Sequence, residues 1–267
     1  MPRKKRDVSR CLLAFLLGTL FVAAGARESV SWTETFNQGR LDLTHWQPTA
    51  EGDCRRCMVS VVDEDGESQR NQRLRISLDT RGTRDDTVKF AGIRARRPIH
   101  LHVGTQIFAL LDWNDQANGS YLSAALIFSA HKTSQNPLKT SEWLSIEYIG
   151  VPPMGNARMA IRVAEKGQEQ TLYSEGWPDT HRTGRKIAQQ EMTIEILDEL
   201  RFRVRENGQV VYESTTHPIP FKKAYLYLQA SSHSNYASRS IDFDDIRVSD
   251  LNGESSNNQA HPSGTDK

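Results

Sequence analysis

Short runs of alternating polar and apolar residues occupy most of the chain. Clear examples are "TQIFALLDW" (105–113), "EMTIEIL" (191–197) and "LRFRVREN" (200–207). A β-strand turns successive side chains to opposite faces, so this alternation predicts strands that are buried on one side. No segment sustains the 3.6-residue period of an amphipathic helix, and the chain is therefore predicted to be all-β.

These runs are separated by turn signals. We expect strands at 88–96, 105–113, 121–130, 142–150, 157–165, 191–197, 200–207, 209–214, 223–231 and 241–249. The turn signals include "NDQANG" (114–119), "GVPPMGN" (150–156) and "ENGQ" (206–209), and the last of these predicts a hairpin. Many short strands between Gly, Pro and Asn turns predict an antiparallel sandwich or barrel in a single domain.

The two ends of the chain depart from this pattern. Basic residues, an apolar run and the small-residue triplet "AGA" predict a secretory signal peptide over 1–26. An uncleaved anchor is the alternative, although the run is shorter than the roughly 20 apolar residues of a membrane span. After Leu251 no aromatic or branched aliphatic residue follows, so 251–267 is expected to be a disordered tail. The β domain is expected to occupy 27–250.

The net charge bears on possible partners, and the cysteines agree with export. The net charge of +1 provides no bulk field for nucleic acid, so no nucleic-acid partner is expected. Cys54 and Cys57 in "GDCRRC" are suited to a short disulfide in an oxidising compartment. A redox pair would need a βα context, and a zinc site would need a second ligand pair at matching spacing. We therefore expect a secreted, periplasmic or extracellular protein with no stable membrane span after signal cleavage.

The run "EWLSIEYIG" (142–150) carries the most suggestive chemistry. As a strand, it places Trp143, Ser145 and Glu147 on one face and the residues between them on the other. The flat face of a tryptophan suits a sugar ring, and the hydroxyl and carboxylate groups suit its hydroxyls. The alternative interpretation is an ordinary half-solvated strand.

The order of several segments resembles a known family. The segments are "ETFNQGRLDLTHWQ" (34–47), "NQRLRISLDT" (71–80), "AGIRARRPIHLHVGTQIFALL" (91–111) and "SIDFDDIRVSD" (240–250). Together they resemble the concanavalin A-like jelly roll, in particular laminarinase-like members of glycoside hydrolase family 16. The resemblance implies an antiparallel β-sandwich whose concave sheet contains residues 142–150 and binds carbohydrate.

The catalytic strand of that family reads Glu-x-Asp-x-Glu, followed by an aromatic residue, an aliphatic residue and Gly. The present chain aligns with this pattern through "EYIG" (147–150), which puts Trp143 at the nucleophile position and Ser145 at the Asp position. Glu147 alone keeps a carboxylate, as a candidate acid/base or a hydrogen-bond acceptor for sugar. Retaining hydrolysis needs two carboxyl groups about 5–5.5 Å apart, so the family's standard reaction is not expected here.

Other residues are candidates for sugar contacts. The aromatic and polar candidates outside the 142–150 run are Trp113, Trp177, Arg162, Tyr225, Tyr227 and Gln229. The last three share one face of "YLYLQ" and loosely resemble the closing Tyr and Gln strand of jelly-roll polysaccharide lyases. Arginines recur at strand period and pair well with carboxylate or sulfate, which favours an acidic glycan. The alternative is that these arginines alternate outward on the convex sheet.

A structural calcium is the one cofactor that the resemblance implies. Jelly rolls of this type often hold the ion near their opening and closing strands, and Asp244 matches an Asp of the family's closing strand. Hard oxygen ligands suit Ca²⁺. The histidines show no metal-ligand spacing.

Three functional hypotheses follow. The first is a secreted carbohydrate-binding protein without two-carboxylate glycosidase chemistry, whose partner is a poly- or oligosaccharide. The second is a divergent polysaccharide-degrading enzyme, either a lyase or a hydrolase that recruits Asp112, Glu165 or Glu175 from another strand. The third is a structural or interaction protein of the cell envelope, in which the concave face is filled by its own side chains.

Overall fold

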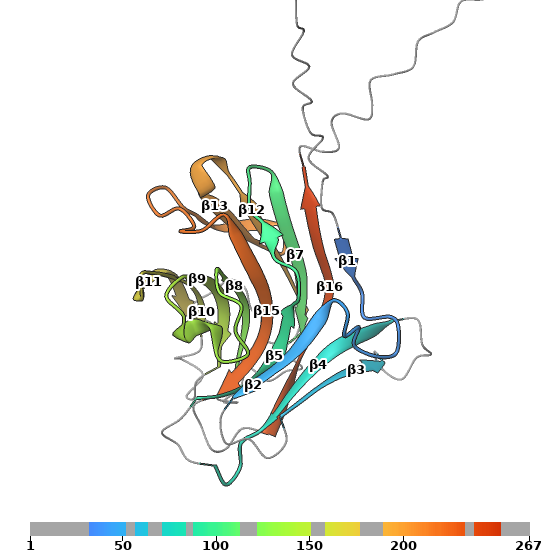
Figure 1. The fold of residues 1–267 in the computed structure, drawn as a ribbon. Helices are drawn as coiled ribbons and strands as arrows, with labels where there is room; N and C mark the ends of the chain where they lie inside the picture. Colours follow the sequence, from blue (N-terminus) through green and yellow to red (C-terminus); the bar gives the residue numbers. More distant parts are fainter. Residues whose placement is uncertain are drawn as a thin grey trace, which may run out of the picture.

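The computed structural model describes residues 32–51, 57–63, 71–83, 88–112, 122–150, 158–176, 189–232 and 238–251. These residues form two antiparallel sheets of eight strands each, and the sheets lie face to face (Figure 1). The predicted all-β sandwich is confirmed. No helix among the described residues is both long enough and apolar enough to cross a membrane.

Sheet A follows the order β14-β13-β12-β7-β16-β4-β3, and β1 pairs with β16. Its strands are β1 (Trp32–Glu34), β3 (Met58–Asp63), β4 (Gln72–Asp79), β7 (Thr105–Asp112), β12 (Gln190–Ile196), β13 (Phe202–Glu206), β14 (Gln209–Glu213) and β16 (Ser238–Asp250). A register shift lies in β16 between Asp244 and Arg247, where Asp245 has a φ of 50°. Such a shift is typical of a β-bulge.

Sheet B follows the order β11-β10-β9-β8-β15-β5-β2, and β6 pairs with β15. Its strands are β2 (Trp46–Glu51), β5 (Lys89–Ala95), β6 (Ile99–His100), β8 (Leu122–Ser129), β9 (Trp143–Ile149), β10 (Arg158–Glu165), β11 (Gln168–Gly176) and β15 (Lys223–Ser232). Between β8 and β9 the chain forms a loop that contains the short 3₁₀ helix η1 (Pro137–Lys139).

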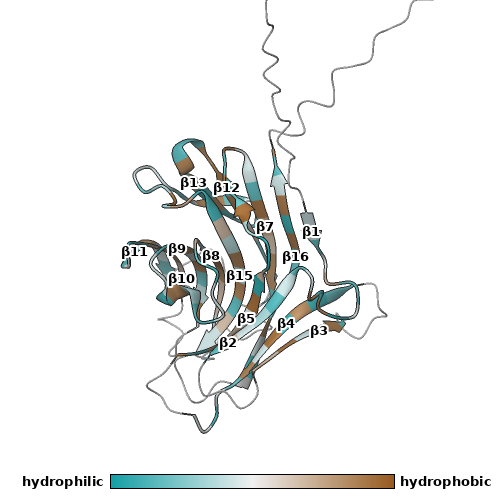
Figure 2. Ribbon diagram, in the orientation of Figure 1, coloured by the Kyte–Doolittle hydropathy of each residue, from teal (hydrophilic) through white to brown (hydrophobic). Residues whose placement is uncertain are grey.

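The main core lies between the sheets, where the apolar faces of the alternating strands meet. Apolar and polar residues alternate along the strands in Figure 2. In β7, for example, Ile107, Ala109 and Leu111 are buried and the residues between them are half-buried. Strand β9 differs because six of its seven residues are buried, on both faces. The outer face of β9 is therefore covered as well.

Two hairpins show how turn chemistry sets the edges of the sheets. The predicted hairpin at 206–209 is confirmed: β13 and β14 pair, and Asn207 and Gly208 have φ values of 50° and 76°. Strands β10 and β11 are joined in the same way by Lys166 and Gly167, with φ values of 52° and 79°. Positive φ at both central positions is the geometry of a type I′ turn.

Each of the ten expected strands is present, with ends that differ by a few residues. The polar edge strand β11 was not expected. Cys57 is disulfide-bonded. Its predicted partner Cys54 lies outside the described residues, so the pairing stays a prediction. The expected signal peptide at 1–26 and most of the expected tail at 251–267 also lie outside them.

Candidate functional site

The site lies on the outer face of sheet B, which is the face that carries Trp143, Ser145 and Glu147 and points away from the main core. Leu144 and Ile146, on the opposite face of the same strand, belong to that core. Pairing through β8 aligns Trp143 with Tyr225, Ser145 with Tyr227, and Glu147 with Gln229. Arg162 lies opposite Ser145 on β10. The structure thus brings together seven of the predicted site residues.

Glu147 is buried and fully engaged with other side chains. It accepts a hydrogen bond of 2.5 Å from Ser145 Oγ. The guanidinium of Arg162 contacts both carboxylate oxygens: Nε donates at 3.0 Å, and Nη2 donates at 2.6 and 2.7 Å. Charge-assisted pairs of this kind are strong and directional. Glu147 therefore orients an arginine, and its oxygens do not face an open cleft.

Arg162 lies between two carboxylates. Its third nitrogen, Nη1, donates to Glu169 on the neighbouring strand β11. The guanidinium also lies over the Trp143 ring, 5.6 Å from its centroid, which is a cation–π distance. Burial lowers the pKa of Arg162, but the charge and hydrogen bonds of Glu147, and then those of Glu169, outweigh burial and raise it. The cation is permanent and is held in place by its partners.

Trp143 is 1% exposed and forms a small second core on the outer face. The other members of this cluster are Ala125, Ile127, Ala164 and Tyr227, with Leu138 and Tyr225 packed against them. The structure therefore does not present Trp143 as the exposed stacking platform that the sequence suggested. The physical reason is the loop over residues 130–141, which folds onto this face.

Two anchors hold that loop in place. The Tyr227 hydroxyl donates to the carbonyl of His131 and accepts from the amide of Thr133, both at 2.9 Å. Glu51 of β2 accepts from the Asn136 amide at 2.8 Å and from Lys139 Nζ at 2.5 Å. Sequence alone did not show this cover, because its contacts join residues far apart in the chain.

A pocket with a volume of about 220 Å³ opens at the end of β9. It is lined by Leu138, Lys139, Thr140, Ser141, Trp143, Ala164, Gly167 and Glu169. The Gly167 amide donates to the carbonyl of Ser141 at 2.9 Å, which ties the β10–β11 turn to the covering loop. Lys139, Ser141 and Glu169 were not among the predicted site residues. Glu169 belongs to the polar run "KGQEQ" (166–170), which does not show the periodicity of a strand.

Of the three candidates on β15, Tyr227 and Gln229 are buried and Tyr225 is half-buried. The guanidinium of Arg94 lies 5.9 Å from the centroid of the Tyr225 ring. Burial raises the pKa of the Tyr227 hydroxyl, so a phenolate is disfavoured there. Gln229 is 2% exposed, and neither its Oε1 nor its Nε2 has a hydrogen-bond partner among the residues that the structure describes.

The carboxylates that a hydrolase was expected to recruit lie elsewhere. Asp112 belongs to sheet A and pairs with Arg73 at 2.7 Å. Glu175 accepts from the hydroxyl of Tyr173 at 2.7 Å. Glu165 is exposed and lies 3.5 Å from Lys166. The carboxylate that approaches Glu147 is that of Glu169, and Arg162 stands between the two.

Asp244, the predicted calcium ligand, does not belong to a cluster of carboxylates among the described residues. Asp244 is buried on β16, and its Oδ1 accepts from the Asp245 amide at 2.7 Å. Calcium takes six to eight oxygen ligands, yet the described residues contain no cluster of three or more His, Cys, Asp or Glu placed to hold a metal. The described residues therefore do not fit a calcium site built from carboxylates. Trp113 and Trp177 lie outside the part of the chain that the structure describes.

No protein-family model matches the chain, and no curated protein shows a significant match. Solved structures do match the chain. A glycoside hydrolase family 16 endo-glucanase from Bacteroides ovatus is 9% identical, with a TM-score of 0.58 over 81% of this chain and 99% of that chain. The carbohydrate recognition domain of Emp47p is 10% identical, with a TM-score of 0.56 over 82% and 94%. The endo-β-1,3-glucanase from Pyrococcus furiosus is 12% identical, with a TM-score of 0.55 over 82% and 93%.

At these identities the likeness concerns the fold. The chain has the concanavalin A-like jelly-roll fold, which confirms the fold that the sequence predicted. The similar structures include both glucanases and a carbohydrate recognition domain, so the fold is compatible with hydrolysis and with binding. The choice between the two depends on the side chains of the site.

Proposed function

We propose that the protein binds carbohydrate and does not cleave it by two-carboxylate chemistry. The single observation that carries the proposal is the ion pair between Glu147 and Arg162. A general acid must hold a proton at the glycosidic oxygen, and a nucleophile must reach the anomeric carbon. Glu147 does neither while Ser145 and Arg162 occupy its oxygens.

The pocket beside Trp143 is the proposed binding site. It combines an aromatic side chain with the polar groups of Lys139, Ser141 and Glu169. Small-molecule sites are generally concave, with apolar walls and a few placed polar groups. A volume of about 220 Å³ suits one sugar unit, and the rest of a longer glycan would extend into solvent.

Neither enzymatic alternative is favoured by the described residues. A hydrolase would need a second carboxyl facing Glu147 across free space, but the guanidinium of Arg162 fills the gap toward Glu169. A lyase would need a base to remove a proton, and burial raises the pKa of the candidate Tyr227. Export to the periplasm or the cell exterior is part of the proposal and rests on the N-terminal sequence pattern.

Calorimetric titration with neutral and acidic oligosaccharides, chosen from a glycan array, tests the proposal. Ser141→Trp fills the pocket and should weaken binding by at least about tenfold, or roughly 1.4 kcal/mol. Ser134→Trp is the matched control, since Ser134 is an exposed serine of the same loop that does not line the pocket. Release of reducing ends from a glucan that is abolished by Glu147→Gln would overturn the proposal.

A further inference from the structure

We propose that the pocket beside Trp143 selects acidic sugars, with the carboxylate or sulfate of the ligand replacing Glu169 on Arg162. This inference rests on the proposed function. It adds the ligand's charge and the side chain that the ligand displaces.

The surroundings of Arg162 are asymmetric. Its inner edge, Nε and Nη2, is bound by Glu147, whose side chain is 6% exposed. Its outer nitrogen, Nη1, is bound by Glu169, whose side chain is 47% exposed. Nη1 carries two N–H groups, and its one hydrogen bond among the described residues goes to Glu169. The inner pair is fixed, and the outer position is exchangeable.

The outer position also opens onto the pocket, because Glu169 is one of the lining residues. The carboxylate of Glu169 therefore marks where an anion can sit, at hydrogen-bonding distance from Arg162 and next to Trp143. Ion pairs that face solvent contribute about 0–1 kcal/mol, so a ligand anion displaces Glu169 at small cost. Removing Glu147 in the same way would leave a buried charge unpaired.

The chemistry of the pocket matches a sugar that carries an anion. Guanidinium groups bind carboxylate and sulfate with matched geometry, whereas a sugar hydroxyl gains no charge assistance. Lys139 adds a second cation at the rim, although it is also paired with Glu51. Ser141 supplies a hydroxyl for a ring substituent. The native carboxylate of Glu169 competes for the same position, so the affinity of the unmodified protein should be modest.

The decisive variant is Glu169→Gln, which removes the competing charge and keeps the shape of the side chain. Its affinity for trigalacturonate should rise about threefold to fivefold, the range expected for loss of one exposed ion pair. Its affinity for neutral laminaritriose should not change. Glu165→Gln is the matched control, because Glu165 lies on the same hairpin and, among the described residues, its ion pair is with Lys166 and not with Arg162. Arg162→Lys should remove the preference for trigalacturonate while the buried charge pair is retained.

Each result is decisive. A gain by Glu169→Gln for trigalacturonate alone supports the inference, and so does binding of trigalacturonate by this variant when the parent binds nothing. Binding of laminaritriose alone, by parent and variant equally, overturns the inference and leaves the proposed function standing. Equal affinity of parent and Glu169→Gln for trigalacturonate also overturns it. Absence of binding to any glycan by either protein overturns the inference together with the proposed function.

Discussion

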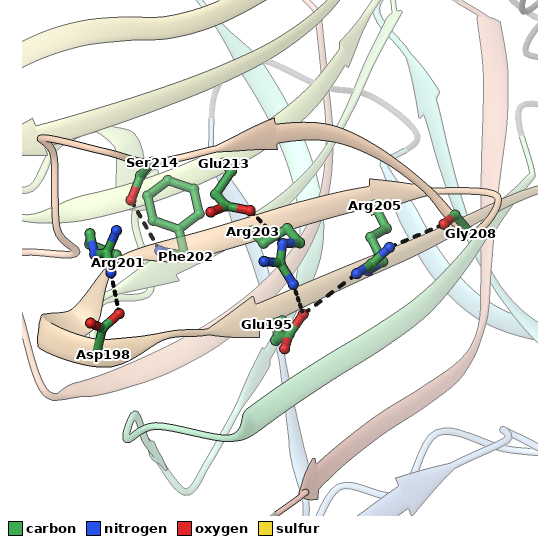
Figure 3. Close-up of polar contacts among 9 residues, drawn as sticks. All are labelled: Glu195, Asp198, Arg201, Phe202, Arg203, Arg205, Gly208, Glu213 and Ser214. Carbon is green, nitrogen blue, oxygen red and sulfur yellow. Dashed lines mark hydrogen bonds and ion pairs between the residues drawn. The ribbon is translucent and has the colours of Figure 1, made fainter.

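The outer faces of the two sheets each hold an arginine between two glutamates from neighbouring strands. On sheet A, Arg203 donates to Glu213 at 2.7 Å and to Glu195 at 3.0 Å (Figure 3). On sheet B, Arg162 donates to Glu147 and Glu169. The arginines are equally exposed, at 25% and 23%. Both arginines thus lie on a central strand between glutamates of the two neighbouring strands. The two regions differ in what covers these side chains.

The difference is the covering loop over residues 130–141. On sheet A both glutamates keep contact with water, at 20% and 40% exposed. On sheet B, Glu147 is buried beside Trp143, and only Glu169 faces solvent. The first region is a solvated ladder of ion pairs that contributes little to stability. The second has one fixed partner and one exchangeable partner, which is the arrangement that makes it a candidate binding site.

The largest expected difference between the regions concerns their aromatic side chains. Trp143→Ala should destabilise the protein by about 3–5 kcal/mol, because it leaves a large cavity under the loop. Phe108, which has Arg247 over its ring at 4.8 Å on sheet A, is only half-buried. Phe108→Ala should cost roughly 1 kcal/mol. Urea unfolding of both variants measures the two values, and equal values would mean that the loop does not seal the outer face of sheet B.

The next largest difference in stability should come from neutralising one glutamate partner of each arginine. Glu147→Gln leaves Arg162 without its main partner, and we expect a loss of about 2–4 kcal/mol, less than for a fully buried pair. Glu195→Gln should change stability by less than about 0.5 kcal/mol. The midpoints of urea unfolding provide the comparison. If both variants lose the same stability, the burial of Glu147 does not make its ion pair with Arg162 stronger than the exposed ion pairs of Arg203.

The sequence pattern predicted which residues share the outer face of sheet B. It did not predict that the loop over residues 130–141 covers them. Strand parity placed Trp143, Ser145 and Glu147 together, and β15, which lies beyond β8 in the sheet, brings Tyr227 and Gln229 to the same face as expected. Parity reports which residues share a face, but it does not report what packs above that face. The cover depends on contacts between residues far apart in the chain, such as that of the Tyr227 hydroxyl with the Thr133 amide.

Glu169 was missed for a related reason. Strand β11 is a polar edge strand, and its run of exposed residues has no alternation from which a strand could be predicted. The turn that starts it places Lys166 at a positive φ, where Asn, Asp or Gly is the usual signal. The corresponding hairpin on sheet A has Asn207 and Gly208 and was predicted.

Acid should loosen the cover on sheet B. The hydrogen bond from Lys139, followed by that from the Asn136 amide, lowers the pKa of Glu51 below its ordinary value of 4.5. A carboxyl group with a lowered pKa stabilises the folded state above the pKa of the unfolded chain, and this contribution is lost as the pH falls through the folded value. The loop should therefore open below about pH 4.5.

Hydrogen exchange at the Thr133 amide, which is bonded to Tyr227, measures this opening. Glu51→Gln should produce faster exchange already at pH 7. Glu213→Gln on sheet A serves as the control and should leave exchange at Thr133 unchanged. Protection of Thr133 that is the same in both variants would show that Glu51 does not anchor the loop.

The smallest expected effect on stability concerns two buried glutamines, whose replacement by leucine should change stability in opposite directions. Gln229, on the outer face of sheet B, has no hydrogen-bond partner in the described part of the chain for either polar side-chain atom. Gln190 on sheet A is equally buried, and its Oε1 accepts from Asn207 Nδ2 at 2.9 Å. An unpaired buried polar group costs about 1–3 kcal/mol, so Gln229→Leu should stabilise the protein by about 1 kcal/mol. Gln190→Leu should destabilise it by a similar amount.

Thermal unfolding of the two leucine variants tests this contrast in sign. A gain for Gln229→Leu would show that the amide is retained at a cost to stability, as is common for groups on functional faces. A loss for both variants would show that Gln229 has a partner in solution. In that case the outer face of sheet B would be a satisfied second core at this position.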